Sequence, residues 1–268
     1  MAPILLRDPP RGPLPDEAAT NGCFETMRAY HGRIFRLDAH VDRLSASAAS
    51  VGIRLPGTPS TFARRLTGAL KRSGIQEAIV RVALWPHPDG PAQPSIVVQP
   101  VAVPPASAYR RGIRVATVPA RKFSVGSINP EIKYSARLGS VLAVMDAQLR
   151  GVDEAIFLDA VGGVTESTAS NMGLVKDGII VTPPCWLGLL AGVTRDVLFE
   201  LARTLRLPIR ETPLTRHDVY NADEMLLMST IKEVLAVTEV DGRRIGTGRP
   251  GPITKQLHRA FRALVSRE

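Results

Sequence analysis

The residue with the clearest potential for chemistry is Lys133, one of only six lysines among the 34 Lys and Arg residues of the chain. It stands in INPEIKYSARLGSVLAV, where a largely apolar helix is predicted from about Tyr134 to Arg150. Desolvation at such a position lowers the pKa of a lysine, and the neutral amine can then attack a carbonyl carbon. A lysine that only solvates the start of a helix explains the same residues, because long amphipathic side chains commonly reach out to water.

Separate segments carry groups that could hold a phosphate. Gly192-Val193-Thr194 opens a predicted helix, whose first amides and dipole attract anions. Arg43, in DAHVDRLSASA, could direct a guanidinium to the same anion. Ser229 and Thr230 follow a predicted strand and offer hydroxyl and amide donors. Each feature also has an ordinary structural explanation: a helix cap, a solvated helix arginine and a turn.

A carboxylate among small and apolar residues, Glu166 in VGGVTESTASN, completes this set. A hydrogen-bonded acid at a strand end explains it equally well. An amine, an anion site and a buried acid are nevertheless the three requirements of pyridoxal phosphate, which needs a Schiff-base lysine, a phosphate site and an acid that keeps its pyridine nitrogen protonated. Composition alone does not establish this cofactor.

Length and composition exclude several classes of protein. The chain has 268 residues, 44% hydrophobic and 22% charged, which excludes a disordered chain and fits one large or two small domains. The longest apolar stretch, Leu187 to Val193, is far shorter than the ~18–20 residues that span a bilayer. The apolar run in MAPILLRDPPRGPLPDE is too short for a secretory signal, so we expect a cytoplasmic protein.

Other binding chemistries find little support. The net charge of +9 is spread along the chain and aromatic residues make up only 5%, which argues against nucleic-acid binding. Cys23 and Cys185 cannot form a disulfide framework, and the five histidines lack ligand spacing, so no metal site is expected. The segment from Gly246 to Gly251 matches G-x-G-x-x-G without room for a βαβ unit, and it predicts a glycine-rich turn entering a helix. Neither a P-loop nor GxSxG is found.

The first half of the chain predicts an α+β arrangement. Two strands should meet at His31-Gly32, followed by a helix with Asp38 as its N-cap that runs through Val51. Thr58-Pro59 should open a second helix. Two further strands, AIVRVALW and SIVVQPV, complete this half.

The second half contains many short strands and few long helices, which favours a barrel-like sheet covered by helices. Asp-Gly pairs at 177–178 and 241–242 predict tight hairpins, and helices are expected at 194–205 and 250–265. We therefore expect a small α/β domain over residues 1–117 and a larger, barrel-like cofactor domain over residues 118–268.

Five segments, in this order, resemble the class IV pyridoxal-phosphate aminotransferases, also called fold type IV, from about Gly22 to Gly251. These segments are GCFETMRAYHGRIFRLDAHVDRLSASA, EIKYSARLGSVLA, DEAIFLDAVGGVTESTASN, GLLAGVTRDVLFELA and NADEMLLMSTIKEVLAVTEVDGRRIGTGRPGP. The resemblance implies a small domain and a larger barrel-like domain with the site between them. It also implies pyridoxal 5′-phosphate as cofactor and a homodimer whose neighbouring subunit completes the substrate pocket.

The same resemblance assigns roles to individual residues. Lys133 matches the lysine that forms the Schiff base and moves the proton at the substrate's Cα, and Glu166 matches the acid facing the pyridine nitrogen. The residues that match phosphate ligands are Arg43, Val193, Thr194 and Thr230, and Ser229 and Ile231 in the same loop could add amides. The residues on first-half strands that could contact substrate are Phe24, Thr26, Arg81 and Trp85. Arg81 suits an α-carboxylate, although a structural ion pair explains it equally well.

A few positions bear on the branch of the family. Phe24 stands where D-amino-acid aminotransferases have a carboxylate-binding tyrosine. Leu138 stands where many branched-chain aminotransferases have a tyrosine, and is found in the D-amino-acid and aminodeoxychorismate lyase branches. FETMR resembles the lyases, whereas STIKEVLAV with DGRRIGTGRPGP resembles the aminotransferases.

We therefore predict a transaminase that moves the amino group of a small or branched-chain amino acid to a 2-oxo acid such as 2-oxoglutarate. The alternative is an aminodeoxychorismate lyase that releases pyruvate and yields 4-aminobenzoate. A third hypothesis, from a different class, is a non-catalytic basic binding protein. The expected partners are the amino acid, the oxo acid and a second subunit, without nucleic acid or membrane.

Overall fold

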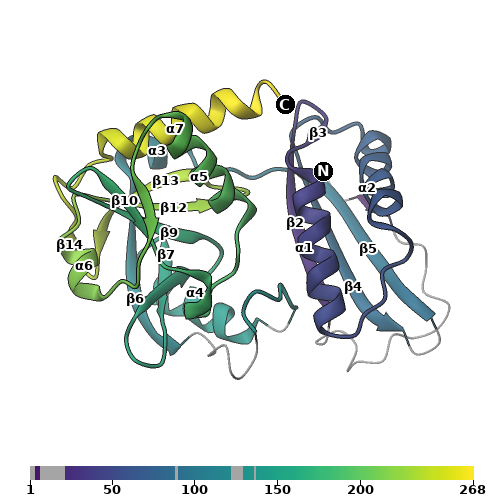
Figure 1. Cartoon of the computed structure of the whole chain (residues 1–268), viewed down its shortest axis with the longest axis horizontal. Coiled ribbons are helices and arrows are strands. Elements are labelled where there is room, and N and C mark those ends of the chain that lie inside the picture. Colours follow the sequence, from purple (N-terminus) through teal and green to yellow (C-terminus); the bar gives the residue numbers. More distant parts are fainter. Residues whose placement is uncertain (1–3, 7–21, 88–89, 122–128, 136) are drawn as a thin grey trace. The chain divides into compact units, whose positions relative to one another are not determined.

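The computed structural model describes residues 4–6, 22–87, 90–121, 129–135 and 137–268 (Figure 1). The chain divides into two compact units. The first unit comprises Met1–Ala102, Ile132–Arg137 and Glu268, and the second comprises Val103–Glu131 and Leu138–Arg267. Strand β6 (Ile113–Arg121) crosses residues 117 and 118, where the sequence suggested a division, and pairs entirely within the second unit. Each unit has its own sheet and its own apolar core.

The first unit contains an antiparallel sheet of five strands in the order β1-β5-β4-β2-β3. Its strands are β1 (Ile4–Leu6), β2 (Cys23–Tyr30), β3 (Arg33–Ile34), β4 (Ala78–His87) and β5 (Gly90–Pro100). The predicted turn at His31-Gly32 joins β2 to β3, with both residues at positive φ (51° and 76°). Such left-handed pairs match the twist of a two-stranded hairpin, which explains the correct prediction.

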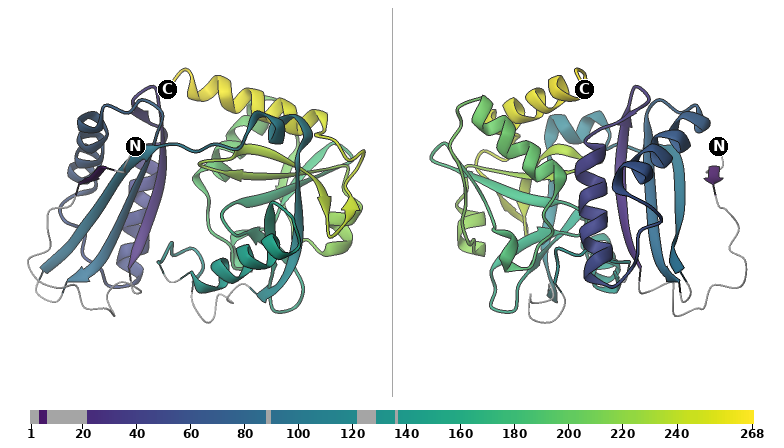
Figure 2. Two further views of the ribbon diagram at one scale, coloured as in Figure 1. Left: turned by 180° about the vertical axis from the view of Figure 1, so that it is seen from behind. Right: turned by 45° about the vertical axis from the view of Figure 1, so that its right-hand side comes forward.

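Two helices, α1 (Leu37–Ser50) and α2 (Pro59–Ser73), cover one face of this sheet (Figure 2). Thr58 accepts a hydrogen bond from the Thr61 amide and caps α2, with Pro59 in its first turn, so that prediction is confirmed. The predicted N-cap of α1 is wrong. Arg36, at φ 52°, occupies the cap position, and Asp38 lies in the first turn, where its charge favours the helix dipole.

The second unit contains a mixed sheet of nine strands in the order β11-β10-β9-β12-β13-β6-β7-β8, with β14 beside β13. Besides β6, its strands are β7 (Glu154–Leu158), β8 (Val164–Ser167), β9 (Asn171–Lys176), β10 (Ile179–Thr182), β11 (Ile209–Glu211), β12 (Glu224–Ser229), β13 (Glu233–Val240) and β14 (Arg243–Arg244). Val164 on β8 forms an isolated bridge with Leu214, three residues after β11, so the two ends of the sheet meet. This closure confirms the expected barrel-like sheet.

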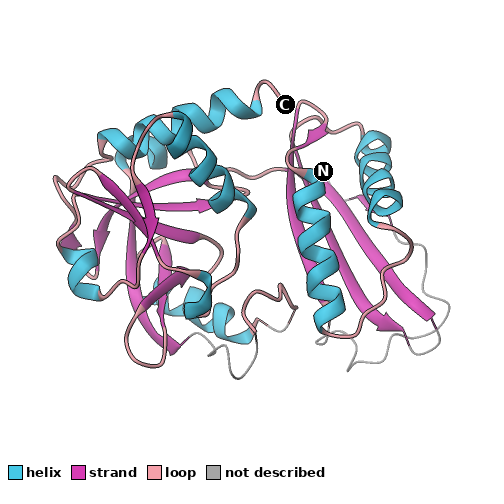
Figure 3. Ribbon diagram, in the orientation of Figure 1, coloured by secondary structure: helices cyan, strands magenta, loops and turns pink. Residues whose placement is uncertain are grey.

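The helical elements of the second unit are α3 (Ala106–Arg111), α4 (Leu138–Leu149), η2 (Cys185–Leu187), α5 (Val193–Thr204), α6 (Arg216–Tyr220) and α7 (Pro252–Val265) (Figure 3). The positions predicted for α5 and α7 agree within two residues. Helix α4 begins four residues later than predicted, because the chain around Lys133 forms turns and a bridge to β2 in the first unit. None of the helices in the described ranges is long and apolar enough to cross a membrane.

Both Asp-Gly turns are confirmed. Asp177 and Gly178 have φ values of 49° and 76°, and Asp241 and Gly242 have values of 51° and 75°. The first pair joins β9 to β10, and the second joins β13 to β14. The glycine-rich segment after β14 is also a turn that enters a helix, as predicted, since Gly251 is the N-cap of α7.

Candidate active site

Lys133 lies in the first unit, at the open edge of β2. Its carbonyl accepts a hydrogen bond from the Phe24 amide at 2.9 Å, and its own amide donates to the Ser47 hydroxyl at 3.1 Å. Tyr134 adds an antiparallel bridge to Cys23. The backbone that bears the amine is thus fixed on both sides, and Nζ lies 4.9 Å from the centroid of the Phe24 ring.

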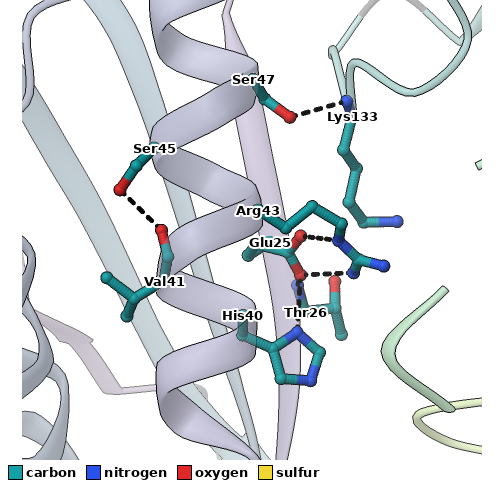
Figure 4. Close-up of polar contacts among 8 residues, drawn as sticks. All are labelled: Glu25, Thr26, His40, Val41, Arg43, Ser45, Ser47 and Lys133. Atoms are coloured by element: carbon teal, nitrogen blue, oxygen red, sulfur yellow. Dashed lines mark hydrogen bonds and ion pairs between the residues drawn. The ribbon is translucent and has the colours of Figure 1, made fainter. Parts of the chain in front are cut away.

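Arg43 projects from α1 toward a buried carboxylate on β2 (Figure 4). Its Nε donates to Glu25 Oε1 at 2.6 Å and its Nη2 to Oε2 at 2.9 Å, which makes the pair bidentate. Glu25 is fully buried, and Oε2 also contacts His40 Nδ1 at 2.9 Å and accepts from the Thr26 amide at 3.2 Å. Burial would raise the pKa of this carboxyl, but Arg43 and His40 outweigh it and lower the pKa from 4.5 to about 2. Burial lowers the pKa of His40, which favours a neutral ring that donates from Nδ1.

The four expected substrate residues lie on one face of the first sheet. Phe24 and Thr26 are two positions apart on β2 and therefore share a face. Arg81 on β4 is directly opposite Thr26. Trp85, four residues further along β4, shares that face, with its ring against Gly22. The Arg81 guanidinium lies 5.5 Å from the Phe24 ring centroid, so a cation and an aromatic ring share this surface.

In the second unit, Glu166 is a buried acid on β8, close to the start of β9. Its Oε2 accepts hydrogen bonds from the Asn171 side chain at 3.2 Å and from the Leu190 amide at 3.1 Å. Asn171 Nδ2 also donates to the Leu190 carbonyl at 2.8 Å. Asn171 therefore ties the acid to the segment that leads into α5.

The N-terminus of α5 has the properties of an anion site. Its N-cap, Gly192, has no side chain that could cap it, and Val193 and Thr194 are buried in its first turn. A Cβ on Gly192 would lie 1.9 Å from Asn171 Oδ1, so only glycine fits there. Helix α7 differs, because the buried Glu224 accepts from the amides of its first turn.

Ser229 and Thr230 belong to the tight connection between β12 and β13. Ser229 Oγ accepts from the Lys232 amide at 3.2 Å, and the Tyr109 hydroxyl donates to the Lys232 carbonyl at 3.1 Å. The next residue, Glu233, is buried at φ 57°, a left-handed conformation that is strained for a non-glycine residue. Two side chains of α7 hold its carboxylate, His258 at 2.9 Å and Arg262 at 2.8 Å. The loop is thus fixed from both sides.

The structure brings the expected site residues together in two sets. The set in the first unit is Phe24, Thr26, Arg43, Arg81, Trp85 and Lys133. The set in the second unit is Glu166, Val193, Thr194, Ser229, Thr230 and Ile231. Within the second set, Met228 pairs with Asn171 across β12 and β9, which places the loop after β12 beside the strand that follows Glu166.

The sequence analysis missed four polar residues that lie around these sets: Glu25, His40, Ser47 and Asn171. A helical spacing was one available signal, because His40, Arg43 and Ser47 recur at i, i+3 and i+7 on one side of α1. The apolar residues of the same helix form a more regular pattern, which predicts the helix but says nothing of its polar side. Asn171 gave no comparable signal, since a polar residue at a strand end is ordinary.

A small α/β unit and a closed mixed sheet, with an edge lysine in one and an uncapped helix in the other, define a fold type IV enzyme. The model of the family described as amino-transferase class IV matches residues 22–240, and the chain belongs to this family. It is therefore an enzyme of the pyridoxal-phosphate-dependent class IV aminotransferase family, and the hypothesis of a non-catalytic binding protein was wrong.

Individual relatives agree with this membership. The chain is 38% identical to a putative branched-chain-amino-acid aminotransferase of Methanocaldococcus jannaschii, over 90% of this chain and 86% of that one. It is 31% identical to a D-alanine aminotransferase of Listeria innocua, over 90% and 86% of the two chains. The crystal structure of the Escherichia coli branched-chain amino acid aminotransferase superposes with a TM-score of 0.88 at 28% identity, over 91% and 85% of the chains.

The residues present fit the cofactor. The chain supplies an amine at Lys133, a guanidinium at Arg43 and an uncapped helix start at Gly192, which suit an aldehyde that carries a phosphate. Glu166 is a buried carboxylate, the kind of group that can keep a pyridine nitrogen protonated. The described residues include no group of three or more His, Cys, Asp and Glu side chains that could hold a metal ion.

Replacement of Gly192 by alanine should weaken cofactor binding. The new Cβ would have to displace Asn171 or the first turn of α5, and we expect an affinity for pyridoxal phosphate at least about tenfold lower, the equivalent of one or two lost hydrogen bonds. The measurement is a fluorescence titration of the apoprotein with the cofactor. Gly90→Ala is the matched control, because its added Cβ would meet only His87 Nδ1, at 4.0 Å, which is an ordinary contact. An unchanged affinity in Gly192→Ala would contradict an anion site at α5.

The low pKa of Glu25 predicts a specific loss of stability in acid. A carboxyl whose pKa is lowered by folding stabilises the protein above pH 4.5, and this contribution disappears as the pH falls toward 2. The free energy of unfolding of the wild type should thus fall by up to roughly 3 kcal/mol more than that of Glu25→Gln over this range. Urea denaturation at a series of pH values measures it. Asp218 and Asp223, whose pKa values are also lowered, are common to both proteins and cancel. Parallel pH curves would refute the prediction.

Proposed function

We propose that this enzyme moves the amino group of a branched-chain amino acid to 2-oxoglutarate. The observation that carries the proposal is the 38% identity to a putative branched-chain-amino-acid aminotransferase over 90% of the chain. The apolar part of the substrate-facing surface on β2 and β4, formed by Phe24 and Trp85, suits an aliphatic side chain. Arg81 on the same face suits the carboxylate of either substrate.

Lys133 would hold the cofactor through its ε-amine. When bound, the cofactor withdraws electrons from the substrate's Cα and so acidifies the Cα proton. In this proposal the Nζ of Lys133 accepts this proton and later returns it during the exchange. Glu166, which Asn171 and the Leu190 amide keep in place, holds the proton on the pyridine nitrogen.

The phosphate is bound by residues from three elements. Arg43 contributes charge and directed N–H donors, and Val193 and Thr194 contribute amides at the start of α5. The loop after β12 adds the groups of Ser229, Thr230 and Ile231. In this scheme the first unit is the small domain and the second the cofactor domain, with their boundary between Ala102 and Val103 for most of the chain.

A second candidate function is aminodeoxychorismate lyase, which the segment FETMR favours. Its Thr26 lies opposite Arg81 on the substrate-facing surface. The two functions differ in product, because the lyase releases pyruvate from 4-amino-4-deoxychorismate and needs no acceptor. The deciding assay measures glutamate formed from 2-oxoglutarate with L- and D-forms of leucine, isoleucine and valine, and pyruvate formed from 4-amino-4-deoxychorismate. Glutamate without pyruvate supports the transaminase, and the reverse result replaces it with the lyase.

Lys133→Ala should abolish the visible absorption band of the covalently attached cofactor. Transamination should fall by at least roughly 10²–10⁴-fold, because the group that transfers the proton is lost. Absorption spectra and steady-state assays measure the two effects. Lys176→Ala is the matched control, since Lys176 is exposed and pairs with Asp223 on the surface. A Lys133→Ala enzyme that retains the band and turns over would overturn the assignment.

The proposed enzyme is a homodimer, as the family resemblance implies, and α4 offers a surface for it. Six apolar side chains of α4 are exposed: Leu138, Val141, Leu142, Val144, Met145 and Leu149. Their exposed fractions reach 70% at Leu138 and 87% at Leu149, which is costly unless another surface covers them. A two-fold axis would bring the same helix of a second copy against this face.

Leu142→Glu should therefore shift the protein from dimer to monomer, because a charge in the centre of the apolar face opposes its burial. Size-exclusion chromatography with light scattering measures the mass. Val161→Glu is the control, because Val161 is 94% exposed and lies outside α4. The α4 interface is excluded if Leu142→Glu stays dimeric, and the dimer itself is excluded if the wild type is monomeric.

A further inference from the structure

One side of α1 and the first residues of β2 hold both the amine and the guanidinium of the proposed site (Figure 4). Arg43 and Ser47 are separated by one helical turn, and each contacts a different partner. Arg43 binds the Glu25 side chain, whereas Ser47 accepts a hydrogen bond from the Lys133 amide. Phe24, the neighbour of Glu25 on β2, donates to the Lys133 carbonyl. Lys133 and Arg43 are thus fixed to the same helix and the same strand.

Within this arrangement, Glu25 determines how the guanidinium is oriented. Both of its oxygens bind Arg43, through Nε and Nη2, and such a two-point contact fixes the plane of the group. His40 and the Thr26 amide occupy further positions on Oε2, so the carboxylate itself cannot rotate without losing them. Four hydrogen bonds on a fully buried group leave one arrangement that satisfies it.

Charge alone predicts that Glu25 weakens the binding of a phosphate by Arg43. An ionised Glu25 offsets the positive charge of Arg43, so its presence weakens the attraction of Arg43 for an anion through space. A buried acid next to a phosphate-binding arginine therefore has a cost for affinity. A positioning role offsets this cost if the direction of the guanidinium matters more for phosphate binding than its net charge.

We propose that Glu25 is a positioning residue, which holds the Arg43 guanidinium in the orientation that binds the cofactor phosphate. The inference rests on the proposed role of Arg43 as a phosphate ligand. Glu25 acts through Arg43 and contacts neither cofactor nor substrate. Its effect is therefore confined to ligands that carry the phosphate.

The test compares two ligands, pyridoxal phosphate and pyridoxal, which differ only in the phosphate group. Apoprotein is titrated with each, and the ratio of the two dissociation constants reports the phosphate preference independently of turnover. The proteins are the wild type, Glu25→Gln, Arg43→Gln and the double variant. Glu77→Gln is the matched control, because Glu77 is a half-exposed carboxylate of the same unit that pairs with Arg28.

The proposal predicts that Glu25→Gln lowers the phosphate preference at least about tenfold, as Arg43→Gln does, with pyridoxal affinity nearly unchanged. The double variant should lose no more than Arg43→Gln alone, because both act through one contact. Glu77→Gln should keep the wild-type preference. If Glu25→Gln fails to fold, Glu25→Asp takes its place, since it keeps the charge but draws the guanidinium out of position.

The possible results separate the inference from the proposed function. If Arg43→Gln leaves the preference unchanged, the phosphate role of Arg43 is wrong. If Arg43→Gln lowers it but Glu25→Gln leaves it unchanged or raises it, Glu25 only offsets charge and the positioning role is refuted. Equal losses for pyridoxal and pyridoxal phosphate in Glu25→Gln would show a merely structural role. A further loss in the double variant would also overturn the inference.

Discussion

A carboxylate without contact with water needs partners for both oxygens, and Glu25 obtains them only if α1 lies in one register against β2. An unpaired charge at this depth would cost several kcal/mol, so alternative registers of the helix are strongly disfavoured. The same register decides where Ser47 meets the Lys133 amide. One buried ion pair thus links the packing of the first unit to the position of Lys133.

Local sequence signals were sufficient for most of the fold. Thr58-Pro59 and the two Asp-Gly pairs act through their own backbone conformations, so a short window of sequence reveals them. The start of α4 was misplaced because Lys133 and its neighbours pair with β2, about a hundred residues earlier in the chain. The start of α1 was misplaced because Arg36 adopts a left-handed conformation that few arginines take.

In the candidate site, too, some residues could be predicted from the sequence and others could not. Lys133, Arg43 and Glu166 were predicted because their types suit one cofactor and their segments resemble one family. The residues that hold them were not predicted, since their roles depend on contacts across the fold: Glu25 meets Arg43 18 positions away, and Asn171 meets the Leu190 carbonyl 19 positions away. Hydrogen-bonding residue types are common, and only the three-dimensional structure shows which of them are paired in the interior.

The glycine N-cap of α5 connects the stability of the fold to the supply of the cofactor. Glu224 of the chain itself accepts hydrogen bonds from the first-turn amides of α7, whereas in the proposed scheme the cofactor phosphate accepts the equivalent bonds at α5. A ligand that binds only the folded state adds RT ln(1 + [L]/Kd) to its stability, about 2.7 kcal/mol at a hundredfold excess over Kd. When the supply of the cofactor falls, newly made chains lose this contribution, and their abundance in the cell should decline before their catalytic constants do.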